Sequence, residues 1–173
     1  DIQADIEPLI YGGGQQDNLR SGTVPLALCV GMGAAAAILS SDQAQAEREL
    51  LRAKTDKLIA QLRSLPWSIR LNGPKDARRH PGNANLRFSG FSGQDILGGL
   101  QPLVAASTGS ACTSGIQEPS HVLRAIGLSA QDAEASIRFS VGRGTTNEDI
   151  DEATGLISAV LLRLAETDFS KSA

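Results

Sequence analysis

The sequence predicts one compact α/β or α+β domain, in which helices cover a sheet. Two observations support this class. Short segments with apolar alternation occur at residues 67–71, 83–88 and 136–140, and longer segments with helical spacing of leucine and isoleucine occur at 42–65 and from 147 onward. The length of 173 residues and the 41% apolar content fit one folded unit with its own core.

Composition and charge limit the partners and the cellular location that we expect. The net charge of −3 and the six aromatic residues disfavour binding to nucleic acid or to an anionic membrane. Two cysteines and no clustered Cys/His pattern predict neither a disulfide framework nor a metal site, so we expect a reducing, cytoplasmic location. The chain begins at Asp1 and its one methionine is Met32, from which we expect a missing upstream region.

The first half of the chain alternates strand and helix signals. We expect a strand end at 6–10, a turn at the three glycines 12–14, a polar loop at 15–23 and a buried helix at 25–40. Ser41 is a suitable cap for a second helix over 42–65, and strands are expected at 67–71 and 83–88 on either side of a basic loop.

The second half repeats these signals. Ser92 and Ser120 are suitable helix caps, and Gly127 is a suitable stop for the short helix after Ser120. We expect strands at 103–106 and around Ile137 to Phe139, and a final helix from Asn147.

Cys112 is the candidate nucleophile. It lies among small, hydroxylated and glycine residues at 107–115, a composition that favours an accessible thiol over a buried one. Cys29, inside the alanine- and glycine-rich segment, is expected in the core.

Other polar residues are weaker candidates. Arg138 alternates with Ile137 and Phe139, so its planar fork is available to a carboxylate, although composition alone favours a plain surface charge. The glycines at 12–14 with residues 20–23 could cradle a phosphate or form an ordinary turn. Surface positions are expected for the two histidines and a further arginine: His80, His121 and Arg143.

Four motifs together resemble the cysteine desulfurases of the NifS/IscS type, in the class V aminotransferase family. They are GGGQ with LRSGT at 12–23, STGSACTS at 107–114, PSHVLRAIG at 119–127 and IRFSVGRGTT at 137–146. The resemblance covers the C-terminal part of such an enzyme, less than half its usual length. It implies the small domain of a fold-type I pyridoxal-phosphate enzyme over 41–173, preceded at 1–40 by the end of the large domain and a connecting helix.

The resemblance also implies roles for individual residues. Cys112 corresponds to the sulfur-accepting cysteine, Arg138 to the arginine that holds the substrate carboxylate, and Thr23 to the residue that reaches the cofactor phosphate of the partner subunit. Asn85 matches the family's strand asparagine and is assigned to substrate binding. The cofactor is pyridoxal 5′-phosphate, but its lysine has no counterpart among the four lysines of the chain: Lys54, Lys57, Lys75 and Lys171.

The implied reaction converts L-cysteine to L-alanine and leaves the sulfur as a persulfide on Cys112. The persulfide then passes to an acceptor or scaffold protein for iron–sulfur cluster assembly or thiolation. The intact enzyme is expected to be a homodimer, and this chain is expected to be inactive alone. Two alternatives stay open: a non-catalytic sulfur-carrier or dimerisation module, and a selenocysteine lyase or other class V relative.

Overall fold

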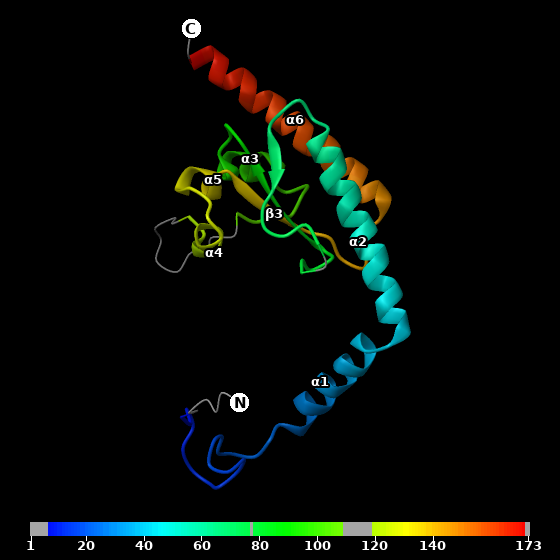
Figure 1. Cartoon of the computed structure of the whole chain (residues 1–173), viewed down its shortest axis with the longest axis vertical. Helices are drawn as coiled ribbons and strands as arrows, with labels where there is room; N and C mark the ends of the chain where they lie inside the picture. The colour runs from blue at the N-terminus through cyan, green and yellow to red at the C-terminus, as the bar shows by residue number, and fades with distance from the viewer. Residues whose placement is uncertain (1–6, 77, 109–118, 172–173) are drawn as a thin grey trace. The chain divides into compact units, whose positions relative to one another are not determined.

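The computed structural model describes residues 7–76, 78–108 and 119–171. The chain divides into two compact units, residues 1–45 and 46–173. Figure 1 shows their helices and strands along the chain. The second unit contains the sheet and most of the helices, which confirms the mixed α/β class.

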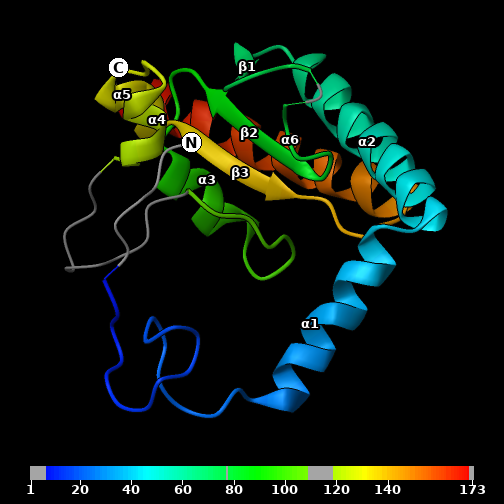
Figure 2. The same cartoon turned by 60° about the horizontal axis from the view of Figure 1, so that its bottom comes forward.

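A three-stranded antiparallel sheet forms the centre of the second unit. Its strands β1 (Ile69–Leu71), β2 (Asn83–Phe88) and β3 (Ser136–Ser140) lie in the order β1-β2-β3, as Figure 2 shows. The register places Asn85 directly opposite Arg138. Each strand was expected near these bounds, because apolar residues alternate with polar ones there.

The alternation gives the sheet one apolar and one polar face. Leu86 and Phe88 on β2 are buried with Ile137 and Phe139 on β3. The intervening residues, Asn85 and Arg138 among them, point to the other face because successive strand side chains alternate.

Three helices cover the apolar face: α2 (Asp42–Arg63), α3 (Gly93–Leu100) and α6 (Asn147–Lys171). They contribute buried residues to one core with the strands, including Leu62 from α2, Ile96 from α3 and Ile157 from α6. Burying a side chain of this size stabilises the fold by about 1.5–3 kcal/mol. Two short helices, α4 (His121–Ala125) and α5 (Ala130–Glu134), precede β3.

The predicted helix caps are confirmed. Ser41 accepts a hydrogen bond from the Ala44 amide at 3.2 Å, and Ser92 accepts one from Asp95 at 3.3 Å. Ser120 caps α4 through the Leu123 amide at 3.5 Å. Each hydroxyl satisfies an amide that the first turn of a helix leaves unpaired.

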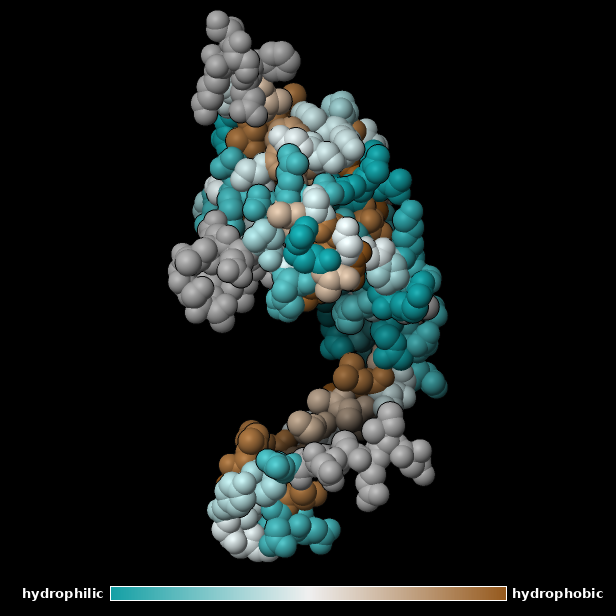
Figure 3. Space-filling view, turned by 60° about the vertical axis from the view of Figure 1, so that its left-hand side comes forward, coloured by the Kyte–Doolittle hydropathy of each residue, from teal (hydrophilic) through white to brown (hydrophobic). Residues whose placement is uncertain are grey.

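The first unit contains helix α1 (Leu26–Leu39), and its predicted burial is wrong. None of its residues is buried, and Cys29, expected in the core, is exposed. Apolar residues lie on all sides of this helix, and residues 7–45 contain no strand that could cover them. Figure 3 shows hydrophobic side chains along the helix. Among the described residues no single helix is long and apolar enough to cross a membrane, and α1 and α2 pass that test only as a bent pair.

Two predicted strands do not form. Residues 7–10 are irregular, since no strand pairs with them, and Ile6 lies outside the described residues. Residues 103–106 instead continue the turn after α3, where the amides of Leu103 and Val104 both donate to the Leu100 carbonyl. Helix α5 was not expected, because five residues carry too little periodicity to indicate it.

Gly82 allows β2 to begin close to the end of β3. Its carbonyl accepts from the Val141 amide at 2.9 Å, and an added Cβ would overlap the Val141 carbonyl oxygen. We therefore expect Gly82→Ala to lower the free energy of unfolding by about 2 kcal/mol, as overpacking commonly does. The control is Gly155→Ala on α6, where a Cβ meets nothing within 4 Å. Gly155→Ala should raise the free energy of unfolding by about 0.5–1 kcal/mol. Equal effects of the two substitutions in urea unfolding would contradict the close backbone approach at Gly82.

Asp151 links α6 to α2. Hydrogen bonds from Gln61 at 2.6 Å and Lys57 at 2.9 Å hold the pKa of its carboxyl below the ordinary 3.8. A depressed pKa means that the stabilisation is complete above pH 3.8 and is lost as the pH falls through the folded-state value. Urea unfolding of Asp151→Asn and of the unmodified chain should therefore differ at pH 6 and converge below pH 3.8. Curves that stay parallel throughout would contradict this.

Candidate functional site

A pocket of about 400 Å³ lies on the polar side of the sheet. Strands β2 and β3 contribute Asn85 and Arg138, the loop after β1 contributes Arg79 and His80, and Ser120 stands at the start of α4. The structure thus brings together two predicted site residues, Asn85 and Arg138, that are far apart in the sequence. Their side chains lie on one face because they are direct cross-strand partners.

Arg138 is one of three arginines that line this pocket, together with Arg78 and Arg79. Arg138 is exposed, and no described residue accepts a hydrogen bond from its guanidinium group. The nearby Arg78 differs, because it forms an ion pair with Asp76 at 2.7 Å. Arg138 therefore retains its full set of donors for an anion, which arginine binds through two parallel hydrogen bonds.

Arg79 holds the loop between β1 and β2 rather than a ligand. Its Nε donates to the Pro74 carbonyl at 2.8 Å, and its Nη atoms donate to the carbonyls of Asn72 and Asn83. Partial burial lowers the pKa of this guanidinium. Carbonyls at both ends of the loop are thereby tied to one side chain, and this fixes one wall of the pocket.

His80 stands at the pocket rim and is exposed, as predicted. Its Nδ1 accepts a hydrogen bond from the Gly82 amide at 3.2 Å. An acceptor nitrogen carries no proton, so the neutral ring carries its proton on Nε2.

The segment that holds Cys112 begins and ends beside this pocket, although Cys112 itself lies outside the described residues. Before the segment, Ser107 exchanges two backbone hydrogen bonds with Arg138, at 2.6 and 3.1 Å. After it, Ser120 lines the pocket. The described ends of the segment are therefore anchored at the candidate carboxylate site.

Thr23 belongs to the first unit and does not line this pocket. The glycine-rich loop before it is closed by the buried Ser21, whose hydroxyl donates to the Gly13 carbonyl at 2.7 Å. The Gly22 amide donates to the side chain of Gln15 at 3.1 Å. Thr23 is exposed, and its hydroxyl has no partner among the described residues.

Each unit by itself offers groups of the kind that a pyridoxal phosphate enzyme uses. In the first unit the exposed Thr23 hydroxyl has no partner among the described residues, and in the second unit Arg138 and Asn85 line one pocket. No lysine is found among the residues that line the pocket. Lys54 and Lys57 instead bind the start of α6, through the Thr145 carbonyl and Asp151. Any cofactor lysine must therefore come from outside the described pocket.

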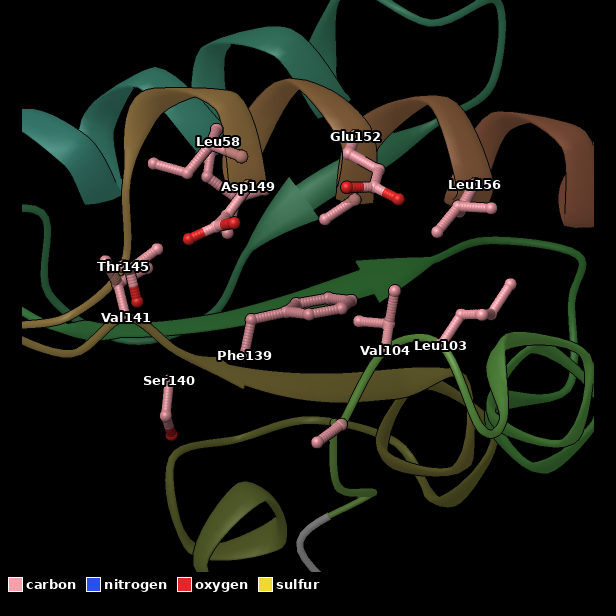
Figure 4. A pocket seen from close by; sticks show the side chains of 13 residues that line it. Leu58, Leu103, Val104, Phe139, Ser140, Val141, Thr145, Asp149, Glu152 and Leu156 are labelled. Carbon is pink, nitrogen blue, oxygen red and sulfur yellow. The ribbon is translucent and has the colours of Figure 1, made fainter.

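A second pocket, of about 300 Å³, suits an anion poorly. Apolar side chains such as Phe139 and Val104 line it, and Figure 4 shows Asp149 and Glu152 on α6 facing them. Two carboxylates in an otherwise apolar hollow repel an anion. Among the residues that the structure describes, no group of three His, Cys, Asp or Glu side chains could hold a metal ion.

Sequence reasoning missed two buried polar residues at the first pocket: Asn72, which lines it, and Ser136, which Asn72 contacts. Asn72 is buried and donates to Asn85 at 2.7 Å and to the buried Ser136 at 2.9 Å. The Asn72-Gly73 pair indicates only a turn in the sequence. Nothing in the spacing indicates a contact with Ser136, which lies 64 residues further on.

Comparisons with known proteins identify the family of the chain. The family model described as aminotransferase class-V matches residues 4–153. A cysteine desulfurase of Frankia sp. (strain EuIK1) is 43% identical over 95% of the chain and 39% of its own length. The cysteine desulfurase IscS of Rickettsia typhi is 43% identical over 92% of the chain and 38% of its own length. The chain thus spans about two fifths of these relatives.

Solved structures show the same fold. A NifS-like protein from Rickettsia africae superposes with a TM-score of 0.74 at 24% identity, covering 91% of this chain and 41% of that one. SspA, solved in complex with cysteine, superposes with a TM-score of 0.55 at 30% identity over 83% and 38% of the two chains. As its motifs predicted, the chain belongs to the class V aminotransferase family, and its relatives there include cysteine desulfurases of the IscS type.

Proposed function

We propose that this chain is the sulfur-accepting part of a pyridoxal-phosphate-dependent cysteine desulfurase. The observation that carries the proposal is the pairing of Arg138 with Asn85 in one pocket, where the described ends of the Cys112 segment are anchored. The family supports the cofactor, and the curated relatives support the reaction. The cysteine bound by the related SspA supports the substrate.

Arg138 and Asn85 bind the carboxylate of L-cysteine in this proposal. The guanidinium neutralises the charge and fixes the plane of the carboxylate, while the amide of Asn85 adds a neutral donor. Holding the carboxylate at two neighbouring strands leaves the rest of the substrate one orientation, and such positioning lowers the barrier of a later step.

Cys112 then accepts the sulfur. Its thiolate attacks the sulfur of the substrate, a sulfur–sulfur bond forms and the carbon–sulfur bond breaks. The carbon keeps the electron pair of the broken bond and takes a proton to give alanine, and Cys112 is left as a persulfide. Pyridoxal phosphate, when bound, supplies the electron sink that this chemistry requires. Cys112 is five residues beyond Ser107, so an extended chain carries it at most about 18 Å from that anchor.

The remaining parts of the proposal concern assembly. Thr23 is proposed to contact the cofactor phosphate of a second subunit in a homodimer. Residues 41–173 are proposed as the small domain and 1–40 as the end of the large one. A cytoplasmic location and a sulfur acceptor or scaffold protein complete the proposal, and each of these stays a prediction.

A non-catalytic sulfur carrier is the second candidate, since no lysine is found among the residues that line the pocket. A carrier needs the thiol of Cys112 but no carboxylate site. The two candidates therefore differ in whether the pocket binds an amino acid.

Arg138→Ala should weaken binding of L-cysteine to the chain about 10- to 100-fold, because it removes charged hydrogen bonds to the carboxylate. Binding is measured by ligand-observed NMR under reducing conditions. The matched control is Arg70→Ala, an exposed arginine on β1 outside the pocket, which should bind as the unmodified chain does. Equal affinities for the unmodified chain and Arg138→Ala would contradict the carboxylate site and favour the carrier.

The sulfur step is tested in a chimera, in which this chain replaces the matching part of the Rickettsia typhi enzyme. Incubation with L-cysteine should add one sulfur atom to Cys112, detected by intact-protein mass spectrometry. Cys112→Ser should abolish the adduct and leave pyridoxal phosphate absorbance unchanged, because the side chain accepts sulfur without holding the cofactor. A chimera that binds the cofactor but forms no adduct, or a serine variant that releases sulfide at the original rate, would refute the desulfurase assignment.

A further inference from the structure

A buried chain of hydrogen bonds runs from Ser136 through Asn72 to Asn85, and the last two of these residues line the pocket. The Ser136 hydroxyl donates to the Asp132 carbonyl at 2.6 Å. The Nδ2 of Asn72 donates to the Ser136 oxygen at 2.9 Å and to the Oδ1 of Asn85 at 2.7 Å. Ser136 is fully buried and Asn72 is 7% exposed, so water competes little for these bonds.

One backbone carbonyl sets the direction of every bond in this chain. The Asp132 carbonyl can only accept, so it takes the single proton of the Ser136 hydroxyl. The Ser136 oxygen must then accept from Asn72, and the Asn72 atom that meets it must be the nitrogen. That same nitrogen faces Asn85, which must therefore present its oxygen.

The orientation of Asn85 follows from this order. The two ends of an asparagine amide have nearly the same shape, so only their partners decide which end faces which way. The Oδ1 of Asn85 is directed at Asn72, and its Nδ2 has no acceptor among the described residues. Asn85 lines the pocket beside Arg138, so its Nδ2 is the amide atom that is available as a donor to a ligand there.

We propose that Asn72 and Ser136 are positioning residues, which hold the Asn85 amide with its nitrogen toward the carboxylate that Arg138 binds. The proposal rests on the proposed function for the identity of that carboxylate. With the amide reversed, Asn85 would present an oxygen to an anion, and the two would repel each other.

The main chain fixes Asn72 on two sides. Its amide donates to the Asn85 carbonyl at 2.9 Å, and its own carbonyl accepts from the guanidinium of Arg79. The side chain of Asn72 can therefore bridge β2 and β3 without moving. This restraint makes the backbone positions of Asn72 and Asn85 independent of the Ser136 hydroxyl.

The amide orientation is tested first without any ligand. Hydrogen exchange of side-chain amides by NMR should show slow exchange for Asn72, whose nitrogen is buried and bonded twice, and fast exchange for Asn85. Ser136→Ala removes the acceptor at little change in volume and should make the Asn72 amide exchange at least about tenfold faster, while the backbone spectrum is retained. Slow exchange at Asn85 with fast exchange at Asn72, or no effect of Ser136→Ala, would overturn the proposal.

The second readout is affinity for L-alanine, the expected product. Ser136→Ala should weaken binding about 3- to 10-fold, and Asn72→Ala should weaken it at least as much, because alanine at position 72 cannot donate to the Asn85 oxygen and leaves that amide free to reverse. Ser140→Ala, at an exposed serine on the same strand, is the control and should have no effect.

The two proposals fail separately. If Arg138→Ala weakens binding of L-alanine while Ser136→Ala and Asn72→Ala do not, the positioning role is wrong and the carboxylate site stands. If Arg138→Ala has no effect, the carboxylate site is wrong, and the exchange pattern alone decides the orientation of Asn85.

Discussion

The antiparallel pairing of β2 with β3 is the constraint on which the site depends. Its register places Asn85 opposite Arg138 on one face and Leu86 opposite Ile137 on the other. A slip by one residue would exchange the faces, burying a guanidinium in the core and exposing leucine and phenylalanine. The apolar packing against α2, α3 and α6 therefore fixes the position of the polar site, although Asn85 and Arg138 are not part of that core.

On the polar face, some donor groups are bonded within the protein and others are open to a ligand. Arg79, Asn72 and Ser136 use their donors within the protein. Arg138 and the nitrogen of Asn85 do not use theirs among the described residues, so the pocket offers donors to an anion. The pocket beside α6 has the opposite character, since Asp149 and Glu152 are there. The amino acid carboxylate that we propose as the ligand is thus favoured on one side of the sheet.

The sequence predicts those elements of the fold that depend on a local pattern of residues. Strand β2 has its predicted bounds because alternation over 83–88 is regular, and Ser41, Ser92 and Ser120 are caps because a hydroxyl at a helix start has a local partner. The strand expected at 103–106 failed because the amides of Leu103 and Val104 bond back to α3. The predicted burial of α1 was wrong because an apolar composition does not show whether another element covers the helix. The bond between Asn72 and Ser136 joins distant segments, and no local pattern indicates it.

The most direct test of the carboxylate site is a chemical-shift titration of the isotopically labelled chain with L-alanine. Binding between Arg138 and Asn85 should shift the side-chain signals of both residues, together with the backbone amides of Ser107 and Ser120 at the pocket edge. Shifts confined to Leu103, Asp149 and Glu152, or no shifts at saturating ligand, would show that the amino acid does not bind where the two strands place these donors.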